Sequence, residues 1–370
     1  MKSAWLEVKD GKISQSINLF LQRLLEEKLV DAVLVPTELP TKSDVAPTLV
    51  TEPGILAQAC PLAPVMPVSM ARVVSSLTRV APSKRKIGVV LRPCDLRALV
   101  ELVKLKQASL ENLLLIGLDC LGTYSPADYR EYHQKTSSPA DEFLRRAKDG
   151  DETNLREACQ VCEYFTPLNA DLVIGLLGTD TEKQILLQAM TPQGEEVLDA
   201  LKLPEAEAEG RETAIAGLKA KRLENKERLF DRVRKEMSGR DNLLDIFASC
   251  TNCHNCVEAC PICYCKECFL KSPAFEWEAE KFLDLAEKKG ALRMPADTLL
   301  FQLTRLNHVG LSCVGCGLCQ DACPSGIPLL ALFRHAGDDV QALFEYVPGE
   351  NLEEEPPLTM FDEEELSWVG

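Results

Sequence analysis

The chain has 370 residues, 46% of them hydrophobic and 26% charged, so it is long enough for more than one domain and too apolar to be disordered. Its formal net charge of −16 argues against a nucleic-acid partner, because phosphate binding needs a basic face. The sequence shows neither an apolar run of membrane-spanning length nor a signal peptide. We therefore expect a cytoplasmic protein without membrane insertion.

The N-terminal half predicts an α/β domain. Apolar spacing indicates an amphipathic helix over 13–28 and a strand over 29–35, in a helix–strand segment that covers 1–45. Three short apolar runs, separated by helical segments such as 96–105, then have the character of buried parallel strands. These strands are expected at Ile87–Leu91, Leu113–Leu118 and 172–177, within a domain that covers 46–203.

The sequence after 203 is mostly helical. A charged helical connector is expected over 204–242, followed at 243–336 by a segment with two dense cysteine runs. About 50 residues separate these runs, and this insert predicts two helices. Ser272-Pro273 indicates the start of the first helix and Gly290 its end, whereas Pro295 starts the second. The leucines expected to face a core from the second helix are Leu299, Leu300, Leu303 and Leu306.

The last segment, 337–370, is predicted to be an acidic C-terminal tail. From 345 to the end it holds nine acidic residues and no Lys or Arg, which is typical of a solvated end. Docking on a partner is the alternative, because apolar residues interleave with the acids. These residues are Leu352, Leu358, Phe361, Leu366 and Trp368.

The two cysteine runs have the spacing of a two-cluster bacterial ferredoxin. Each reads Cys-x2-Cys-x2-Cys-x3-Cys-Pro, and the fourth cysteine of such a run binds the other cluster. This rule predicts two 4Fe-4S clusters, one held by Cys250, Cys253, Cys256 and Cys323, the other by Cys313, Cys316, Cys319 and Cys260. Zinc is the alternative, but zinc sites usually pair two Cys-x2-Cys units, and a zinc-stapled scaffold fits this spacing less well.

A second set of cysteines lies in the α/β domain. Cys94 and Cys120 each follow a predicted strand directly, and the pair Cys159 and Cys162 precedes the third. Ligands gather at the carboxyl ends of parallel strands, so these four thiols are predicted to hold a third 4Fe-4S cluster. The alternative for the first two is packing as small buried hydrophobes.

Four further cysteines lie outside these sets: Cys60, Cys263, Cys265 and Cys268. Packing or a redox reserve is the expected role. A fourth cluster is the alternative, and it would require a distant partner for Cys60.

Several motifs carry a family resemblance. The α/β segments Arg92-Pro-Cys-Asp-Leu-Arg-Ala98, Ile116-Gly-Leu-Asp-Cys-Leu-Gly-Thr123, Cys159-Gln-Val-Cys162 and Ala170-Asp-Leu-Val-Ile-Gly175 resemble the beta subunits of coenzyme F420-reducing hydrogenases and formate dehydrogenases. The helical insert and the stretch from Arg305 to Cys319 resemble the α-helical dicluster ferredoxin domains of succinate dehydrogenase-type and heterodisulfide reductase-type subunits.

The resemblance implies an α/β flavin/iron–sulfur domain followed by a mostly α-helical dicluster ferredoxin domain. It implies an oxidoreductase subunit that carries FAD and exchanges electrons between a two-electron carrier, coenzyme F420 or similar, and a partner. The partner would be a catalytic hydrogenase or formate dehydrogenase subunit, or a heterodisulfide reductase-like one. Arg92 and Arg97 are candidates to stabilise the reduced flavin. A flavin-free dicluster adapter with no substrate site is the alternative.

Overall fold

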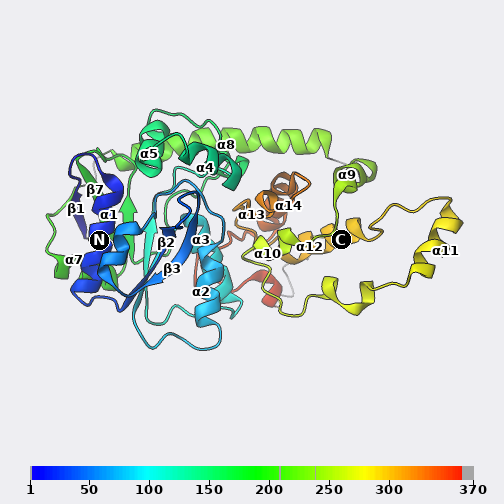
Figure 1. Ribbon diagram of the computed structural model, residues 1–370, viewed down its shortest axis with the longest axis horizontal. Coiled ribbons are helices and arrows are strands. Elements are labelled where there is room, and N and C mark those ends of the chain that lie inside the picture. The colour runs from blue at the N-terminus through cyan, green and yellow to red at the C-terminus, as the bar shows by residue number, and fades with distance from the viewer. Residues whose placement is uncertain (1, 208–209, 238, 361–370) are drawn as a thin grey trace.

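The structure is a computed structural model that describes residues 2–207, 210–237 and 239–360 (Figure 1). An α/β domain leads into a helical region, as the sequence predicts. The domain is built on a seven-stranded sheet with the order β1-β7-β6-β5-β4-β2-β3. The strands are β1 Ser3–Glu7, β2 Ala32–Glu38, β3 Val45–Val50, β4 Ile87–Leu91, β5 Leu113–Leu118, β6 Leu172–Gly175 and β7 Gln184–Ala189.

The centre of the sheet is parallel. β4 pairs with β2 on one side and with β5 on the other, and β5 pairs with β6, all in parallel. Every residue of β4, β5 and β6 is buried, as expected for strands covered on both faces. The three predicted parallel strands are thus confirmed, although β6 ends before Leu176. The backbone N–H groups of Leu176 and Leu177 donate to Asp119 instead of continuing the strand.

Two antiparallel edges complete the sheet, and neither was predicted. β3 folds back on β2, while β7 joins β6 to the N-terminal β1. β2 and β3 are neighbours in the sequence, whereas the pairing of β1 with β7 joins segments from opposite ends of the domain sequence.

Helices cover both faces of the sheet and form the second half of the chain (Figure 1). The predicted amphipathic helix is α1, which buries its apolar face, including Ile17, Leu21 and Leu24. The helices are α1 Ile13–Glu26, α2 Met70–Thr78, α3 Pro93–Lys104, α4 Pro126–His133, α5 Pro139–Lys148, α6 Glu157–Gln160, α7 Pro192–Leu201, α8 Arg211–Glu236, α9 Arg240–Ile246, α10 Asn255–Ala259, α11 Ala279–Lys289, α12 Thr298–Val309, α13 Leu318–Asp321 and α14 Leu329–Leu343.

One apolar core joins the α/β domain to the helical region. It contains Leu99 of α3 and Leu115 of β5 together with Phe301 of α12 and Phe333 of α14. Because these side chains exclude water together, the helical region packs on the sheet domain as part of the same core.

The helical insert differs from prediction at two places. Ser272-Pro273 begins only a short 3₁₀ turn, Pro273–Phe275, because Ser272 makes no side-chain cap, and α11 starts at Ala279. Gly290 ends α11 in the left-handed conformation, as predicted. Helix α12 starts at Thr298, and it turns Phe301 and Arg305 inward.

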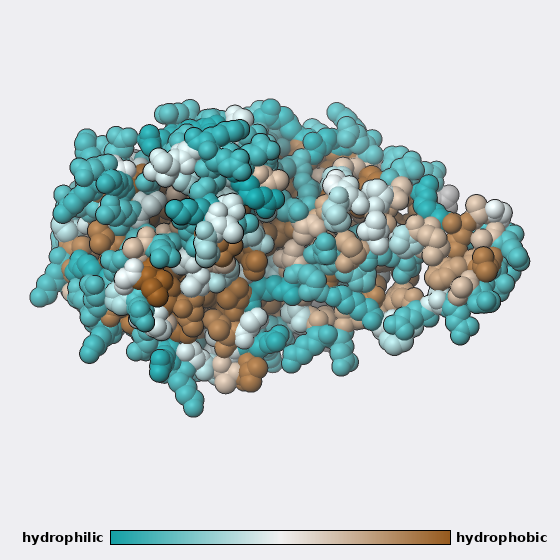
Figure 2. All heavy atoms as spheres, in the orientation of Figure 1, coloured by the Kyte–Doolittle hydropathy of each residue, from teal (hydrophilic) through white to brown (hydrophobic). Residues whose placement is uncertain are grey.

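The predicted core face of α12 is therefore wrong in part. Leu300 and Leu303 are 54% and 44% exposed, because the helix is rotated to bury polar side chains near the cysteines. Exposed apolar side chains also gather on the projecting segment that carries α11, visible in brown at that end of Figure 2. They include Phe269, Leu283 and Met294.

The segment predicted as an acidic tail packs against its own chain over part of its length. Helix α14 continues to Leu343, and Tyr346 is buried against α3. Phe361, Leu366, Trp368 and the side chain of Leu358 lie outside the described residues. Within the described ranges, no helix is both long and apolar enough to span a membrane.

Candidate metal centres

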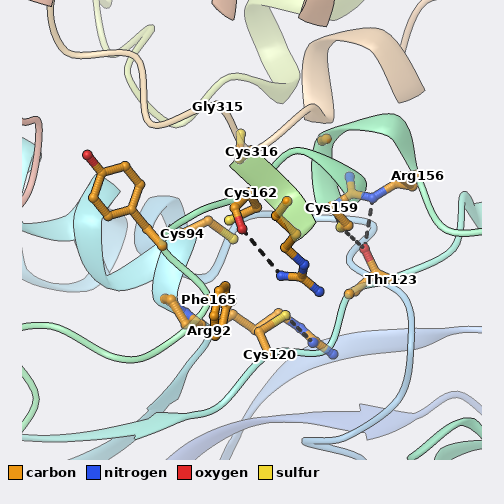
Figure 3. A pocket seen from close by; sticks show the side chains of 15 residues that line it. Arg92, Cys94, Cys120, Thr123, Arg156, Cys159, Cys162, Phe165, Gly315 and Cys316 are labelled. Carbon is orange, nitrogen blue, oxygen red and sulfur yellow. Dashed lines mark hydrogen bonds between the residues drawn. The ribbon is translucent and has the colours of Figure 1, made fainter. Parts of the chain in front are cut away.

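The four cysteines of the α/β domain line one cavity, which has an empty volume of about 390 Å³ (Figure 3). Cys94 lies in the first turn of α3 and Cys120 follows β5, so the two parallel strands deliver both thiols to the same sheet edge. Cys159 lies on α6, and Cys162 follows this short helix. The structure thus brings together the whole set that was predicted to hold a third cluster.

Cationic side chains surround these thiols, and two of them contact a sulfur. The Arg92 guanidinium donates to Cys120 Sγ over 3.4 Å, and Arg156 Nη2 donates to Cys159 Sγ over 3.7 Å. Arg222 of α8 also lines the cavity and donates to the Leu121 carbonyl. Positive charge favours thiolates over thiols, so the cavity suits an anionic, cysteine-bound group.

Sequence reasoning missed Arg156 and Arg222. Arg156 is three residues before Cys159, which was a local signal for a side chain near that sulfur. Arg222 lies on the charged connector helix and donates to the Cys162 carbonyl. No neighbouring residue in the sequence indicates this contact.

The pKa shifts of the thiols follow burial and these charges. Burial raises the pKa of Cys94 well above its ordinary value, and the nearby Cys120 and Cys316 add to this. Burial would also raise the pKa of Cys159, but the Arg156 charge and the Thr123 hydrogen bond bring it below the ordinary value.

A second cavity is lined by all four cysteines of one predicted ferredoxin-type set. They are Cys260, Cys313, Cys316 and Cys319. Arg305 and Arg334 lie in the same wall. Hydrogen bonding with Cys263 lowers the pKa of Cys260 to about 6, while burial raises the pKa of Cys319 to about 12. Cys316 and Gly315 line the first cavity as well, so the two cavities share a wall.

The other ferredoxin-type set is gathered around Cys256. Burial raises the pKa of the Cys256 thiol, Arg305 opposes this, and three neighbouring thiols raise it further: Cys250, Cys323 and Cys253. Gln302 Nε2 donates to Cys250 Sγ over 3.5 Å. Because Cys253 is exposed, this set lies nearest to solvent.

The spacing of the sulfurs distinguishes two kinds of metal site. Over residues 2–207, 210–237 and 239–360, no group of three or more His, Cys, Asp or Glu side chains has the geometry to hold one metal ion. The thiols surround cavities instead of converging on a point. A cubane cluster binds each thiolate through a different iron, so it needs sulfurs that are spread around such a space. Two of the three predicted cysteine sets line such a space.

A third, mostly apolar pocket lies beside Arg92, at the carboxyl ends of β4 and β5. Its wall contains Pro36, Pro47, Pro61, Val65, Met66 and Pro67. Asp95 also lines it, and its carboxylate accepts a hydrogen bond from Ser69. The lining thus combines apolar side chains with one cation and one carboxyl, a combination typical of sites for small organic ligands.

The remaining predicted residues lie elsewhere. Arg97 lines none of these three cavities and is buried between α3, the C-terminal segment and the loop after Cys313. Cys60 packs against the core of the α/β domain. Cys263 and Cys268 pack against a different core, the one shared with the helical region.

Comparison with known proteins finds a family that is similar to part of the chain. Residues 84–211 match the family described as the C terminus of the coenzyme F420 hydrogenase/dehydrogenase beta subunit. The matched residues begin just before β4 and contain all four cysteines of the α/β set.

Two relatives match over nearly their whole length. The chain is 27% identical to the F420-dependent formate dehydrogenase subunit beta of Methanocaldococcus jannaschii, covering 90% of this chain and 91% of that one. It is 26% identical to the F420-dependent formate dehydrogenase 1 subunit beta of Methanococcus maripaludis, covering 95% and 94%. Both relatives are named as subunits of a formate dehydrogenase, which is an oxidoreductase.

A solved structure of the F420-reducing NiFe hydrogenase complex from Methanosarcina barkeri also contains a similar chain. The similarity covers 65% of this chain and 94% of that one, with 16% sequence identity and a TM-score of 0.47.

Proposed function

We propose that the chain is the electron-transferring, FAD- and iron–sulfur-containing beta subunit of a formate dehydrogenase- or hydrogenase-type complex. It passes electrons between a two-electron carrier, coenzyme F420 or similar, and a catalytic or heterodisulfide reductase-like partner. The observation that carries the proposal is the gathering of Cys94, Cys120, Cys159 and Cys162 around one cavity that also contains Cys316. This arrangement supports a redox site joined directly to a cluster relay.

The cysteine sets support a relay of three 4Fe-4S clusters. The α/β set would hold the first of them, next to the set of Cys260, Cys313, Cys316 and Cys319 across the shared wall. The set around Cys256 would follow, because Cys260 and Cys323 each belong to one run and complete the set of the other. The exposure of Cys253 supports a position for this last set nearest to a partner.

The cavity beside Arg92 supports a flavin site at the end of the relay that is opposite the exposed Cys253. FAD, when bound, exchanges electrons in pairs with a carrier and singly with clusters. Arg92 lines this cavity and also contacts Cys120, so its charge would act on both the ring and the adjacent thiolate. The prolines and valines of the wall would exclude water from the ring.

Anaerobic purification followed by iron, sulfide and flavin assays tests the proposal. We expect about 12 irons and one flavin per chain, at four irons per cubane. About 8 irons and no flavin would replace the proposal with the flavin-free adapter. Zinc without sulfide would contradict both.

The carrier is tested on the same preparation. Reduced coenzyme F420 added anaerobically should bleach the visible absorption of the clusters, whereas NADH should do so much more slowly, because no Gly-x-Gly-x-x-Gly motif follows a strand. Bleaching by NADH alone would assign the chain to another carrier.

A further inference from the structure

Arg97 connects three segments that are far apart in the sequence. It lies on α3 and is 2% exposed. Its Nε donates to the Pro348 carbonyl over 2.8 Å, and its Nη1 donates to the Val314 carbonyl over 3.3 Å. The guanidinium also lies 3.8 Å from the centre of the Tyr164 ring.

Two of these contacts belong to the walls of the two neighbouring cavities. Val314 lies between Cys313 and Cys316, and it lines the second cavity. Tyr164 lies two residues after Cys162 and lines the first. One side chain of the α/β domain therefore holds an element of each wall, on both sides of the shared Cys316.

The third contact, with the Pro348 carbonyl, comes from the C-terminal segment, which covers Arg97. A side chain at position 349 would come within 2.4 Å of the Arg97 backbone, so Gly349 lets the C-terminal segment pass directly over this residue. Asn169 holds the same segment through the carbonyls of Gly349 and Glu350. Arg97 is thus enclosed and has little freedom to move.

The way in which Arg97 is buried is costly. Its hydrogen-bond acceptors are backbone carbonyls, and its Nη2 has no partner among the described residues. Burial lowers its pKa, and the nearby Arg334 lowers it further. A buried cation without a hydrogen-bonded carboxylate is expensive, so an apolar residue would serve packing better.

We propose that Arg97 is a positioning residue that fixes the separation of the two cluster sites on either side of Cys316, and so sets the rate of electron passage between them. The inference rests on the proposed function. In the step concerned, one electron leaves the cluster of the first cavity and enters that of the second. The first is oxidised and the second reduced by one electron, and no bond or proton changes place. A two-electron carrier supplies the electron and the metal centre of a partner removes it.

The rate of such a step falls steeply with distance, so a small shift of the loop that contains Val314 matters. Without the Arg97 guanidinium, the loop would lose its hydrogen bond to α3 and Tyr164 would lose its cation–π contact with the same helix. A misplacement of about 1 Å can slow a geometry-dependent step by up to about a hundredfold, and we expect about tenfold here.

The test compares Arg97→Met with Lys104→Met in the full chain. Lys104 is also a buried residue of α3, and its Nζ donates to the Tyr346 hydroxyl of the same C-terminal segment over 2.7 Å. Among the described residues, the hydrogen bonds of Lys104 go to Glu101 and Tyr346, and neither residue lines a cavity. The control therefore loosens the C-terminal segment without releasing the cavity walls.

Three measurements are made on each variant: iron content, magnetic interaction between the reduced clusters by electron paramagnetic resonance, and the rate of cluster reduction after rapid mixing with the reduced carrier. Arg97→Met should retain its iron, show weaker magnetic interaction and transfer electrons about tenfold more slowly. Lys104→Met should match the unmodified chain. Unchanged interaction and rate in Arg97→Met would overturn the inference.

A variant that conserves charge covers the case in which Arg97→Met fails to fold. Lys cannot donate to Val314 and Pro348 with the same fixed fork, so Arg97→Lys should fold and still weaken the interaction. Amide hydrogen exchange over 313–317 should be faster in this variant, with or without clusters. Unchanged exchange would also overturn the inference. An unmodified chain with about 8 irons would contradict the proposed function and so remove the premise of the inference, whereas unchanged exchange in Arg97→Lys would contradict the inference alone.

Discussion

Arg156 of the α/β domain forms an ion pair with Asp321 of the helical region. The same guanidinium donates to Thr123 Oγ1 over 2.8 Å and to Cys159 Sγ over 3.7 Å. Asp321 lies between Cys319 and Cys323, which belong to the two ferredoxin-type sets. One buried arginine therefore connects a thiol of the first cavity to α13, which contains Cys319 and ends just before Cys323. Arg156 therefore both supplies positive charge beside the Cys159 thiol and helps to hold the helical region against the α/β domain.

Arg156→Met should lower the reduction potential of the cluster that we propose at Cys159. A reduced cluster carries one more negative charge, so a nearby cation and a hydrogen bond to sulfur stabilise it. Potentiometric titration with spectroscopic detection measures the shift. Arg232→Met is the matched control. Arg232 forms an ion pair with Glu157 of α6, the helix that contains Cys159, but its side chain is 44% exposed. A potential that is equal in both variants would show that Arg156 acts on packing alone.

Replacing Cys159 and Cys162 together with Ser should remove about four irons per chain, because a cubane needs its thiolates. The signals of the two ferredoxin-type clusters should persist. Cys60→Ser serves as the control, since this thiol lines none of the three cavities described, and it should leave the iron content unchanged. Retention of all iron in the double variant would exclude a cluster at these cysteines.

Asp119→Asn should destabilise the chain by about 3 kcal/mol, the scale for leaving one partner of a buried ion pair unpaired. Asp119 is fully buried and binds Arg211 Nη1 over 2.5 Å, and it also accepts the N–H groups that end β6. The free energy of unfolding in urea measures the loss. Asp180→Asn, which removes an exposed ion pair with Lys183, should change it little. Equal effects would mean that the Asp119–Arg211 pair contributes no more than a surface pair.

Alkaline pH should release the C-terminal segment from α3. Burial raises the pKa of Tyr346, and its hydrogen bond to Glu101 raises it further. A raised pKa contributes stability that is complete below the pKa of an unfolded tyrosine, about 10, and is lost as the pH rises toward the folded value. Stability measured by denaturation should fall above about pH 10, and Tyr346→Phe should reduce the slope. An identical slope in the variant would assign the loss to other tyrosines.

The sequence by itself determined the parts of this protein that local patterns encode. Apolar runs indicated the parallel strands at Ile87–Leu91 and Leu113–Leu118, and strand direction then put Cys94 and Cys120 at one edge. Cysteine spacing defined the two ferredoxin-type sets, and the structure gathers the members of each. Such features depend on residues that are neighbours in the chain, so periodicity and spacing reveal them.

Only the tertiary structure decided how these parts meet. Arg97 contacts Val314 and Pro348, which are 217 and 251 residues away, and Arg156 reaches Asp321 across 165 residues. Cys316 belongs to one cysteine run, yet it also lines the cavity of the α/β set. The rotation of α12 that exposes Leu300 likewise follows from packing near the cysteines. These contacts form when segments that are distant in the sequence bury a common core. The free energy of that burial depends on the whole fold, so a local sequence pattern does not predict it.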